Sequence, residues 1–385
     1  MKTPIFWGLL LLVAAVACDD VNESTEAEKC VPERCRLPDC RCSGTDIPGG
    51  IRPRSVPQFV TLTFDDAVTP LNMVTYRRLL YNRRNSNNCP IGTTFYMSHE
   101  YTDYQSINEL YNRGFEIALH SITHKHDQDY WRNADYETLV KEFVDQRTQV
   151  AHFANIPSNA VKGVRMPFLQ MAGDAQFIMM ANHSLLYDAS MATINLINPG
   201  LWPYTLHYRS TQECNVPPCP TSSIHGPWVL PILAWRDLED FPCPFVDACS
   251  RGPNLQDEEG WYNFFLKNFE NHYLGNRAPF GFYVHEAFIR THPAVERALA
   301  RFLNLLNSLN DVFMVNSEEV IEWVRNPIPL TEYRQQRCRT VQPTTCRFSN
   351  PCRIRSDHNG NTYYMPVCTA CPRRYPWIGN PLGTW

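Results

Sequence analysis

The sequence lacks an excess of charge of one sign. Its 385 residues include 35 Lys and Arg against 39 Asp and Glu, so the net charge is −4, and the two signs are interspersed along the chain. Nucleic-acid binding requires a basic face that neutralises phosphate groups, and no such face is visible in this sequence. We therefore expect no nucleic-acid partner.

The sequence also lacks an apolar run long enough to cross a membrane. The most apolar run lies in residues 1–17, which combine one lysine, a short apolar segment and the small residues Ala15 and Ala17. This run is too short to span a bilayer, and its pattern is typical of a secretory signal peptide. A lipid anchor on Cys18 is the alternative. We expect a secreted, extracellular protein without a membrane span.

Cysteine, in contrast, is plentiful and concentrated near both ends. Ten of the fifteen cysteines lie within residues 18–42 and 338–371. In an exported chain this usage indicates disulfide bonds, which we interpret as staples on termini and loops. The CxC of residues 40–42 and the CxxC of residues 368–371 could instead bind zinc or act in redox chemistry, but an oxidising compartment favours disulfides. The sequence does not decide the connectivity.

Composition divides the chain into an extension, a body and a second extension. The length and the 44% hydrophobic content allow one large core. Residues 18–58 are polar and rich in Pro, Gly and Cys, which predicts a cysteine-rich extension that wraps onto the body. Residues 59–330 alternate strand-like and helix-like segments, which is typical of an α/β fold with a parallel sheet. Residues 331–385 predict a cysteine-rich C-terminal extension packed on that body.

The alternation comprises about eight strand–helix repeats. We expect strands at 60–64, 93–97, 115–119, 160–165, 184–188, 228–234, 280–285 and 312–315. We expect helices at 70–82, 104–112, 135–153, 261–273, 293–309 and 317–325. Residues 195–257 interrupt the rhythm with clustered Pro and Cys, and loops of that length are usually functional.

The first expected strand ends at two adjacent carboxylates. The stretch FVTLTFDDA (59–67) carries an apolar, β-branched run up to Asp65 and Asp66. Neighbouring side chains at a strand end point to different sides, so one carboxylate can hold a cation while the other takes protons. A turn followed by a helix N-cap at Thr69 is the alternative.

Two histidines follow another expected strand. His120 and His124 lie in HSITH, directly after residues 115–119. Two imidazoles four residues apart can face one cation from a single helical turn, and Asp66 can add an oxygen ligand. Three protein ligands leave positions free for water and substrate, as in catalytic zinc sites. Surface histidine is the alternative for a lone HxxxH, and we interpret residues 125–126 as surface residues.

Further polar residues also end expected strands. Arg165, in VRMPF, can hold Asp65 by a forked hydrogen bond or form a surface salt bridge. His285, in FGFYVHEAF, can act in the chemistry or lie buried in the core. In parallel α/β folds, active sites lie at the C-terminal ends of strands. We therefore predict one site that contains Asp65, Asp66, His120, Arg165, Asp188 and His285.

With the motifs TFDDA, HSITH, RMPF, YDAS and YVH in this order, the chain resembles the polysaccharide deacetylases of carbohydrate esterase family four, which share the NodB homology domain. Within the family it is similar to the secreted arthropod chitin deacetylases of the single-domain type, also in LPDCRCSGTDIPGG. The resemblance covers about residues 30–330 and implies that residues 59–330 form the catalytic domain. The chitin-binding and low-density-lipoprotein-receptor-like modules of many relatives are not visible.

The resemblance implies an α/β fold of the distorted (β/α) barrel type and zinc-dependent hydrolysis of the N-acetyl groups of chitin or its oligomers. Another divalent transition metal is the alternative cofactor. Position by position, the resemblance implies metal ligands at Asp66, His120 and His124, a general base at Asp65, a general acid at His285, and Arg165 as the residue that orients the base. Phe168 is expected to bind substrate through a backbone N–H to the oxyanion. Asp188 is expected to support His285 or to shape the acetyl pocket.

Other expectations concern substrate and setting. We expect Trp202 and Trp235 to stack on sugar rings, with burial in the core as the alternative. The sequons at Asn22 and Asn182 predict glycans. We expect a monomer in a chitinous matrix such as cuticle or gut lining. The alternative functions are a weakly active or inactive chitin-binding matrix protein and a deacetylase of another acetylated polysaccharide.

Overall fold

The computed structural model describes residues 26–347 and 351–384. The predicted signal peptide, Cys18 and the sequon at Asn22 lie outside these residues. None of the described helices is long and apolar enough to cross a membrane.

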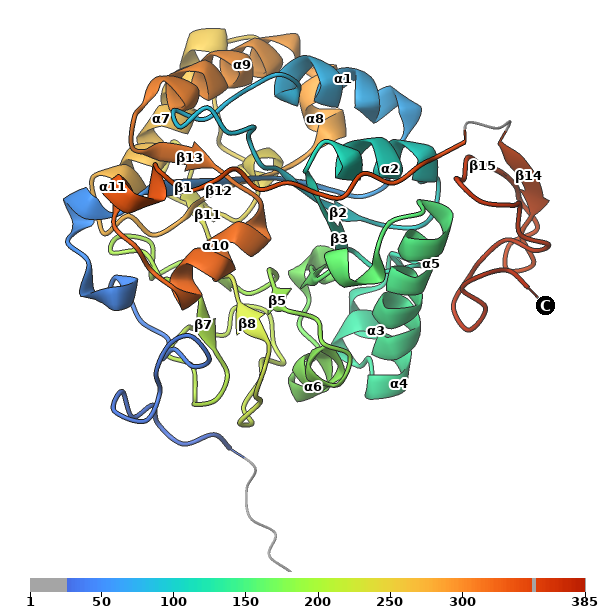
Figure 1. Ribbon diagram of the computed structural model, residues 1–385, viewed down its shortest axis with the longest axis horizontal. Coiled ribbons are helices and arrows are strands. Elements are labelled where there is room, and N and C mark those ends of the chain that lie inside the picture. Colours follow the sequence, from blue (N-terminus) through green and yellow to red (C-terminus); the bar gives the residue numbers. More distant parts are fainter. Residues whose placement is uncertain (1–25, 348–350, 385) are drawn as a thin grey trace, which may run out of the picture.

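A curled nine-stranded sheet forms the centre of the structure (Figure 1). Its order is β12-β1-β2-β3-β4-β5-β8-β7, and β13 also pairs with β1. Each pair is parallel except β7 with β8. The strands are β1 (Gln58–Asp65), β2 (Thr94–Met97), β3 (Glu116–Leu119), β4 (Gly163–Val164), β5 (Tyr187–Asp188), β7 (Tyr204–Thr205), β8 (Trp228–Val229), β12 (Phe280–His285) and β13 (Val312–Met314).

The sheet is a half-barrel, because no strand pairing within the described residues joins β7 to β12. The prediction of a distorted (β/α) barrel is confirmed in this open form. The central strand is β1, whose eight residues are all buried. It pairs with β13 at its beginning, through residues 58–60, and with β2 at its end, through residues 63–65. This position explains why its sequence is a continuous apolar and β-branched run.

Helices cover the sheet, and most of them agree with the predicted ones. Figure 1 shows α1, α7, α8 and α9 together at the top and α3 to α6 at the lower right. The helix expected over residues 135–153 forms as α4 and α5 joined by a π-helical turn, Val140–Val144. The helices are α1 (Pro70–Leu80), α2 (Tyr104–Asn112), α3 (Gln128–Arg132), α4 (Tyr136–Leu139), α5 (Asp145–Phe153), α6 (Asp174–Asn182), α7 (Glu258–Tyr273), α8 (Glu286–Thr291), α9 (Pro293–Ser308), α10 (Ser317–Arg325) and α11 (Leu330–Tyr333).

Short two-stranded pairs and 3-10 turns fill the interrupting and terminal segments. The pairs are β6 (Ala192–Thr193) with β9 (Ile232–Leu233), β10 (Trp235–Arg236) with β11 (Pro242–Cys243), and β14 (Cys352–Arg355) with β15 (Thr362–Met365). The 3-10 turns are Pro48–Gly50, Pro53–Ser55, Ser158–Ala160, Pro167–Leu169 and Val246–Ala248.

Seven disulfide bonds within residues 26–347 and 351–384 fasten the extensions and the long loops. Their pairs are Cys30–Cys42, Cys35–Cys40, Cys89–Cys338, Cys214–Cys219, Cys243–Cys249, Cys346–Cys368 and Cys352–Cys371. The cysteines of the CxC and CxxC motifs are all included, which confirms the disulfide interpretation over zinc or redox sites. Six bonds are local, whereas Cys89–Cys338 ties the C-terminal extension to the body.

The C-terminal extension packs along α2 and α5, with the β14–β15 hairpin at the right of Figure 1. Backbone hydrogen bonds join Tyr104 N to Pro366 O at 3.0 Å and Cys368 N to Phe153 O at 2.7 Å. The imidazole of His99, just after β2, contacts the carbonyl of Pro376 at 2.9 Å. The extension therefore reaches the edge of the sheet where β2 ends.

Candidate active site

The predicted polar residues meet at the C-terminal edge of the sheet. The register pairs Asp65 of β1 with His285 of β12, and Leu119 of β3 with Val164 of β4. The residues that follow Leu119 and Val164, His120 and Arg165, therefore leave the sheet side by side. A cavity of 440 Å³ lies at this edge, and its lining includes Asp65, Asp66, His120, His124, Phe168, Asp247 and His285.

Asp66, His120 and His124 bring their ligand atoms together as the sequence predicts. One nitrogen or oxygen atom of each lies within 4.8 Å of those of the other two. Asp66 Oδ1 is 3.4 Å from His124 Nε2 and 3.9 Å from His120 Nε2. These spacings suit atoms that bind one cation at about 2.0–2.2 Å each. The two nitrogens and one oxygen form a donor set suited to a divalent transition metal.

The state of the imidazoles fits this role. His120 Nδ1 donates a hydrogen bond to the carbonyl of Arg165 at 2.8 Å, which leaves the lone pair on Nε2, the atom that faces Asp66. Burial and the neighbouring His124 lower the pKa of His120 to about 3. Burial also lowers the pKa of His124. Both rings are therefore neutral near pH 7, which is the form that binds a metal.

The segment that carries the histidines is a loop, so the expected helical turn is wrong. Ser121 and His124 have φ of 76° and 40°, outside the right-handed helical region. The buried carboxylate of Glu142 holds this loop, because it accepts hydrogen bonds from the backbone N–H groups of Ile122 and Thr123 at 3.1 and 2.9 Å. A buried acid, not a helix, sets the spacing of the two rings.

Asp65 lies behind the donor set and is held by Arg165. The Arg165 guanidinium is fully buried; its Nη1 donates to Asp65 Oδ1 and to Thr63 Oγ1, and its Nε donates to the carbonyl of Ala189. It also lies 3.8 Å over the ring of Tyr96. Burial raises the pKa of Asp65, and the positive charge of Arg165 opposes this rise. Arg165 thus favours the carboxylate form that a general base needs.

His285 lies near Oδ2 of Asp66, whereas His120 and His124 lie near Oδ1. It also has a carboxylate partner that the sequence did not reveal. His285 Nδ1 donates to Asp247 Oδ2 at 2.7 Å, and His285 Nε2 is 3.8 Å from Asp66 Oδ2. Burial alone would lower the pKa of His285, but the hydrogen bond to Asp247 and the nearby carboxylates raise it to about 9. The imidazolium form therefore predominates near neutral pH, as a general acid requires.

Asp247 could have been found from one local signal. It lies in a 3-10 turn inside the loop closed by Cys243–Cys249, and that loop also places Phe245 on the face of His285, with ring centroids 5.3 Å apart. An acid between two closely spaced cysteines marks a rigid loop that can present a carboxylate. Asp247 does not follow an expected strand, so the search for polar residues at the C-terminal ends of strands did not include it.

Asp188 has contacts that differ from both of its expected roles. It is fully buried and accepts hydrogen bonds from Gln176 Nε2 at 2.6 Å and from Ser190 N and Oγ at 2.9 and 2.6 Å. It is not among the residues that line the cavity, and the carboxylate bonded to His285 Nδ1 is that of Asp247. Asp188 therefore belongs to the framework beneath the site.

Trp202 and Trp235 are core residues, so the expectation that they stack on sugars is corrected. Trp202 is fully buried and its ring is stacked on Trp323, with centroids 5.5 Å apart. Trp235 is 2% exposed, packs on Phe280 at 5.3 Å and donates from Nε1 to the carbonyl of Gly281. Neither ring is free to contact a carbohydrate.

Phe168 is the predicted substrate-binding residue that does lie at the cavity. Its side chain is 47% exposed, and its ring centroid lies 5.4 Å from that of His124 and 6.1 Å from that of His126. His126, expected as a surface residue, is exposed and also lines the cavity. Three aromatic rings thus form one wall of the site.

Comparisons with known proteins agree with the motifs. Residues 53–181 match the family model described as polysaccharide deacetylase. The chain is 58% identical to chitin deacetylase 8 of Bombyx mori over 382 residues, which cover 99% of each chain. It is 38% identical to chitin deacetylase 1 of Bombyx mori over 387 residues, which cover 95% of this chain and 71% of the relative. The solved chitin deacetylase from the fungal pathogen Colletotrichum lindemuthianum superposes with a TM-score of 0.37 at 13% identity, covering 70% of this chain and 90% of that one.

Proposed function

The chain belongs to the polysaccharide deacetylase family, and we propose that it hydrolyses the N-acetyl groups of chitin or chitin oligomers, releasing acetate and leaving glucosamine units. The named relatives are chitin deacetylases, and the more similar one matches the chain over 99% of both lengths. The observation that carries the proposal is the cavity itself. In this cavity the donor atoms of Asp66, His120 and His124 lie near two further groups. One is the Asp65 carboxylate, which Arg165 holds, and the other is the His285 imidazole, which Asp247 holds.

Asp66, His120 and His124 would hold the metal, for which we propose Zn²⁺. When bound, the cation supplies Lewis-acid chemistry, because it polarises the acetyl carbonyl and lowers the pKa of a water molecule. The donor set supports this assignment, since neutral imidazoles and one carboxylate suit zinc. Other divalent transition metals accept the same donors.

Asp65 acts as the general base in this proposal. Its carboxylate takes a proton from the water whose oxygen attacks the acetyl carbon, while Arg165 holds the carboxylate in place. The backbone N–H of Phe168 is the proposed donor to the oxygen that becomes negatively charged. These groups lie on the cavity lining or directly behind it.

His285 acts as the general acid. As the C–N bond breaks, protonated His285 delivers its Nε2 proton to the departing amine, and acetate is the other product. Asp247 keeps the proton on Nδ1 and stabilises the imidazolium before the transfer. Arg165 therefore favours the charged form of Asp65 and Asp247 the charged form of His285, which are the opposite states that acid–base partners require.

The decisive experiment is acetate release from soluble N-acetylchitooligosaccharides, with and without a chelator, followed by addition of Zn²⁺. We expect activity that the chelator removes and Zn²⁺ restores. Acetylated xylan and peptidoglycan in parallel assays test the alternative substrates. A folded, metal-loaded protein that binds chitin but releases no acetate would be the inactive matrix protein instead.

We also propose that the protein is secreted and glycosylated. Seven disulfides support an oxidising, extracellular location, and the exposed Asn182 at the end of α6 suits a glycan. We further propose that the catalytic domain spans residues 59–330 with both extensions packed on it, and that the protein acts as a monomer. Peptide mapping of protein from the culture medium and light scattering test these points.

A further inference from the structure

The turn that carries Phe168 has an unfavourable backbone conformation. Phe168 and Leu169 are consecutive non-glycine residues with φ of 58° and 53°. Left-handed conformations are costly for residues with a Cβ, and they persist where surrounding structure holds them. Phe168 and Leu169 both line the cavity: Phe168 lies beside His124, and the side chain of Leu169 is 9% exposed and packs with Phe245. Some feature of the fold must therefore hold this turn.

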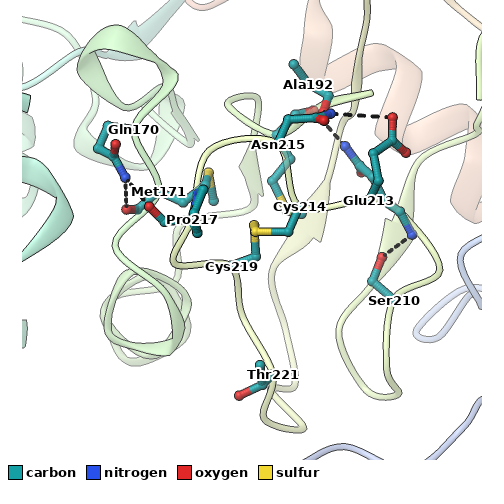
Figure 2. The surroundings of a disulfide bond; sticks show 12 residues. Gln170, Met171, Ala192, Ser210, Glu213, Cys214, Asn215, Pro217, Cys219 and Thr221 are labelled. Carbon is teal, nitrogen blue, oxygen red and sulfur yellow. Dashed lines mark hydrogen bonds between the residues drawn. A yellow bond between two sulfur atoms is a disulfide. The ribbon is translucent and has the colours of Figure 1, made fainter. Parts of the chain in front are cut away.

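Gln170 is the side chain that ties the turn to its surroundings. It is fully buried, and its Nε2 donates to the carbonyls of Met171 at 2.8 Å and Pro217 at 2.7 Å. Its Oε1 accepts from Gln128 Nε2 at 3.0 Å. Gln128 begins α3, shortly after the metal-ligand loop, so one amide joins three segments that are distant in sequence. Figure 2 shows Gln170 reaching toward Pro217.

Pro217 lies in the loop closed by Cys214–Cys219, which we call the clamp loop (residues 214–219). A second bond from this loop reaches the same segment, because Gly173 N donates to Pro218 O at 3.0 Å. The disulfide closes the clamp loop over a separation of five residues. Figure 2 shows this disulfide between Gln170 and Met171 on one side and Glu213 on the other.

The clamp loop is itself anchored on both sides. Before it, Glu213 Oε1 accepts from Thr193 Oγ1 at 2.7 Å and from Asn195 N at 3.0 Å. After it, Asp174 Oδ1 at the start of α6 accepts from Thr221 N at 2.8 Å and from Ser222 N at 3.0 Å. A short, cross-linked loop with fixed ends is a rigid support.

We propose that Gln170, backed by the clamp loop, is a positioning residue that holds the Phe168–Leu169 turn in the geometry that deacetylation requires. The inference rests on the proposed function. It assigns a role to part of the long segment 195–257, which interrupts the alternation of strands and helices. Gln170 is not among the cavity-lining residues, so its effect on the reaction passes through the turn.

The first test replaces Gln170 with glutamate. Gln170→Glu keeps the size of the side chain but has no N–H group, so the carboxylate form donates neither bond and the protonated form donates at most one. Removing an oxyanion donor lowers kcat by about 10²- to 10³-fold, and displacing one is expected to lower it by about 10- to 100-fold. KM for N-acetylchitotetraose should stay within about twofold, and metal content should not change.

The matched control is Gln149→Glu in α5. Gln149 is also fully buried, and its side-chain amide has no hydrogen-bond partner within the described residues. It is absent from the cavity lining, so this variant carries the cost of a buried carboxylate without touching the turn. We expect a lower melting temperature in both variants, but a lower kcat per folded, metal-loaded molecule only for Gln170→Glu.

The second test opens the clamp loop without changing the turn. Cys214→Ser with Cys219→Ser is expected to lower kcat by about 3- to 10-fold, because Gln170 keeps its partners but the support becomes mobile. Cys35→Ser with Cys40→Ser is the control, since this disulfide also closes a separation of five residues and lies in the N-terminal extension. It should leave kcat unchanged.

Amide hydrogen exchange supplies a readout that does not depend on activity. Exchange of residues 166–173 should be faster in Gln170→Glu than in the wild type and in Gln149→Glu. Unchanged exchange there, or equal kcat values for Gln170→Glu and Gln149→Glu, would overturn the inference. A wild-type protein that releases no acetate would overturn the proposed function, whereas the exchange measurement would still decide whether Gln170 holds the turn.

Discussion

Asp247→Asn tests the pairing of His285 with Asp247 most directly. The substitution keeps an oxygen that can accept from His285 Nδ1 but removes the negative charge 2.7 Å away. A carboxylate within hydrogen-bond distance raises the pKa of a histidine by about 1–3 units. Because 40% of the His285 side chain is exposed, solvent screens this interaction, and we expect the lower end of the range, about one unit.

The pKa of His285 should therefore fall from about 9 to about 8 in Asp247→Asn. In the proposed mechanism the rate follows the protonated fraction of His285, so the change in rate is expected only on the alkaline side of the pH profile. At pH 6 both proteins are fully protonated and should react equally fast. At pH 8 the protonated fraction falls from about 90% to about 50%, and at pH 9 from about 50% to about 10%, a loss of about twofold and fivefold.

The assay is kcat for acetate release from N-acetylchitotetraose between pH 5.5 and pH 10, with metal content measured for each protein. Asp240→Asn is the control, because it removes one negative charge from the nearby exposed turn between β10 and β11 and keeps a residue that tolerates the positive φ of 67° there. An alkaline limb at the same pH in wild type and Asp247→Asn would refute the pairing. A loss of equal size at every pH would show a structural effect instead.

Asp66→Ala should lose bound metal, whereas Asp65→Asn should keep the metal and lose most of its turnover; metal analysis of the purified variants, with acetate release, measures both. Trp235→Ala should lower the free energy of unfolding by about 3–5 kcal/mol in urea, because a buried ring leaves a cavity. Burial and Glu318 raise the pKa of Glu116 to about 7, above its value in the unfolded chain. The contribution of Glu116 to the free energy of unfolding should therefore fall as pH rises from about 4.5 to 7, and Glu116→Gln should lack this contribution.

Each of these outcomes has a clear contradiction. Normal metal content in Asp66→Ala would remove Asp66 from the ligand set. A Trp235→Ala protein with unchanged stability but a higher KM for chitin oligomers would show that Trp235 binds substrate. Equal pH dependence of unfolding in wild type and Glu116→Gln would show that Glu116 is not protonated in the folded protein.

Most of the site follows from one topological rule. Parallel strands in neighbouring positions end at the same edge, so Asp65, His120, Arg165 and His285 meet although up to 220 residues separate them. Asp247 does not follow from this rule, because a disulfide-closed loop and not a strand delivers it. The rule fixes where a strand ends and says nothing about which loop folds back over that end.

Helices and strands whose ends are marked by local sequence signals were predicted more accurately than segments without such signals. The expected bounds of α2 and β12 agree with the structure, because a cap or a strand end limits each one. The long segment 195–257 was interpreted only as functional, since its short strands and two disulfide loops carry no period. Trp202 and Trp235 show the same limit, because the burial of an aromatic ring in such a segment depends on distant helices and strands.

The unusual backbone conformations explain why buried polar side chains gather beneath the cavity. Asp66, Ser121, His124, Phe168 and Leu169 all have positive φ, and each such residue costs about 1–3 kcal/mol. Glu142 holds the histidine loop through the backbone N–H groups of Ile122 and Thr123, and Gln170, which follows the Phe168 turn, is held by bonds to the carbonyls of Met171 and Pro217. An apolar side chain at either position would fill the space but donate or accept nothing, so the loop could relax to a right-handed conformation. The proposed metal ligands and the proposed oxyanion donor therefore keep their places through buried side chains that do not line the cavity.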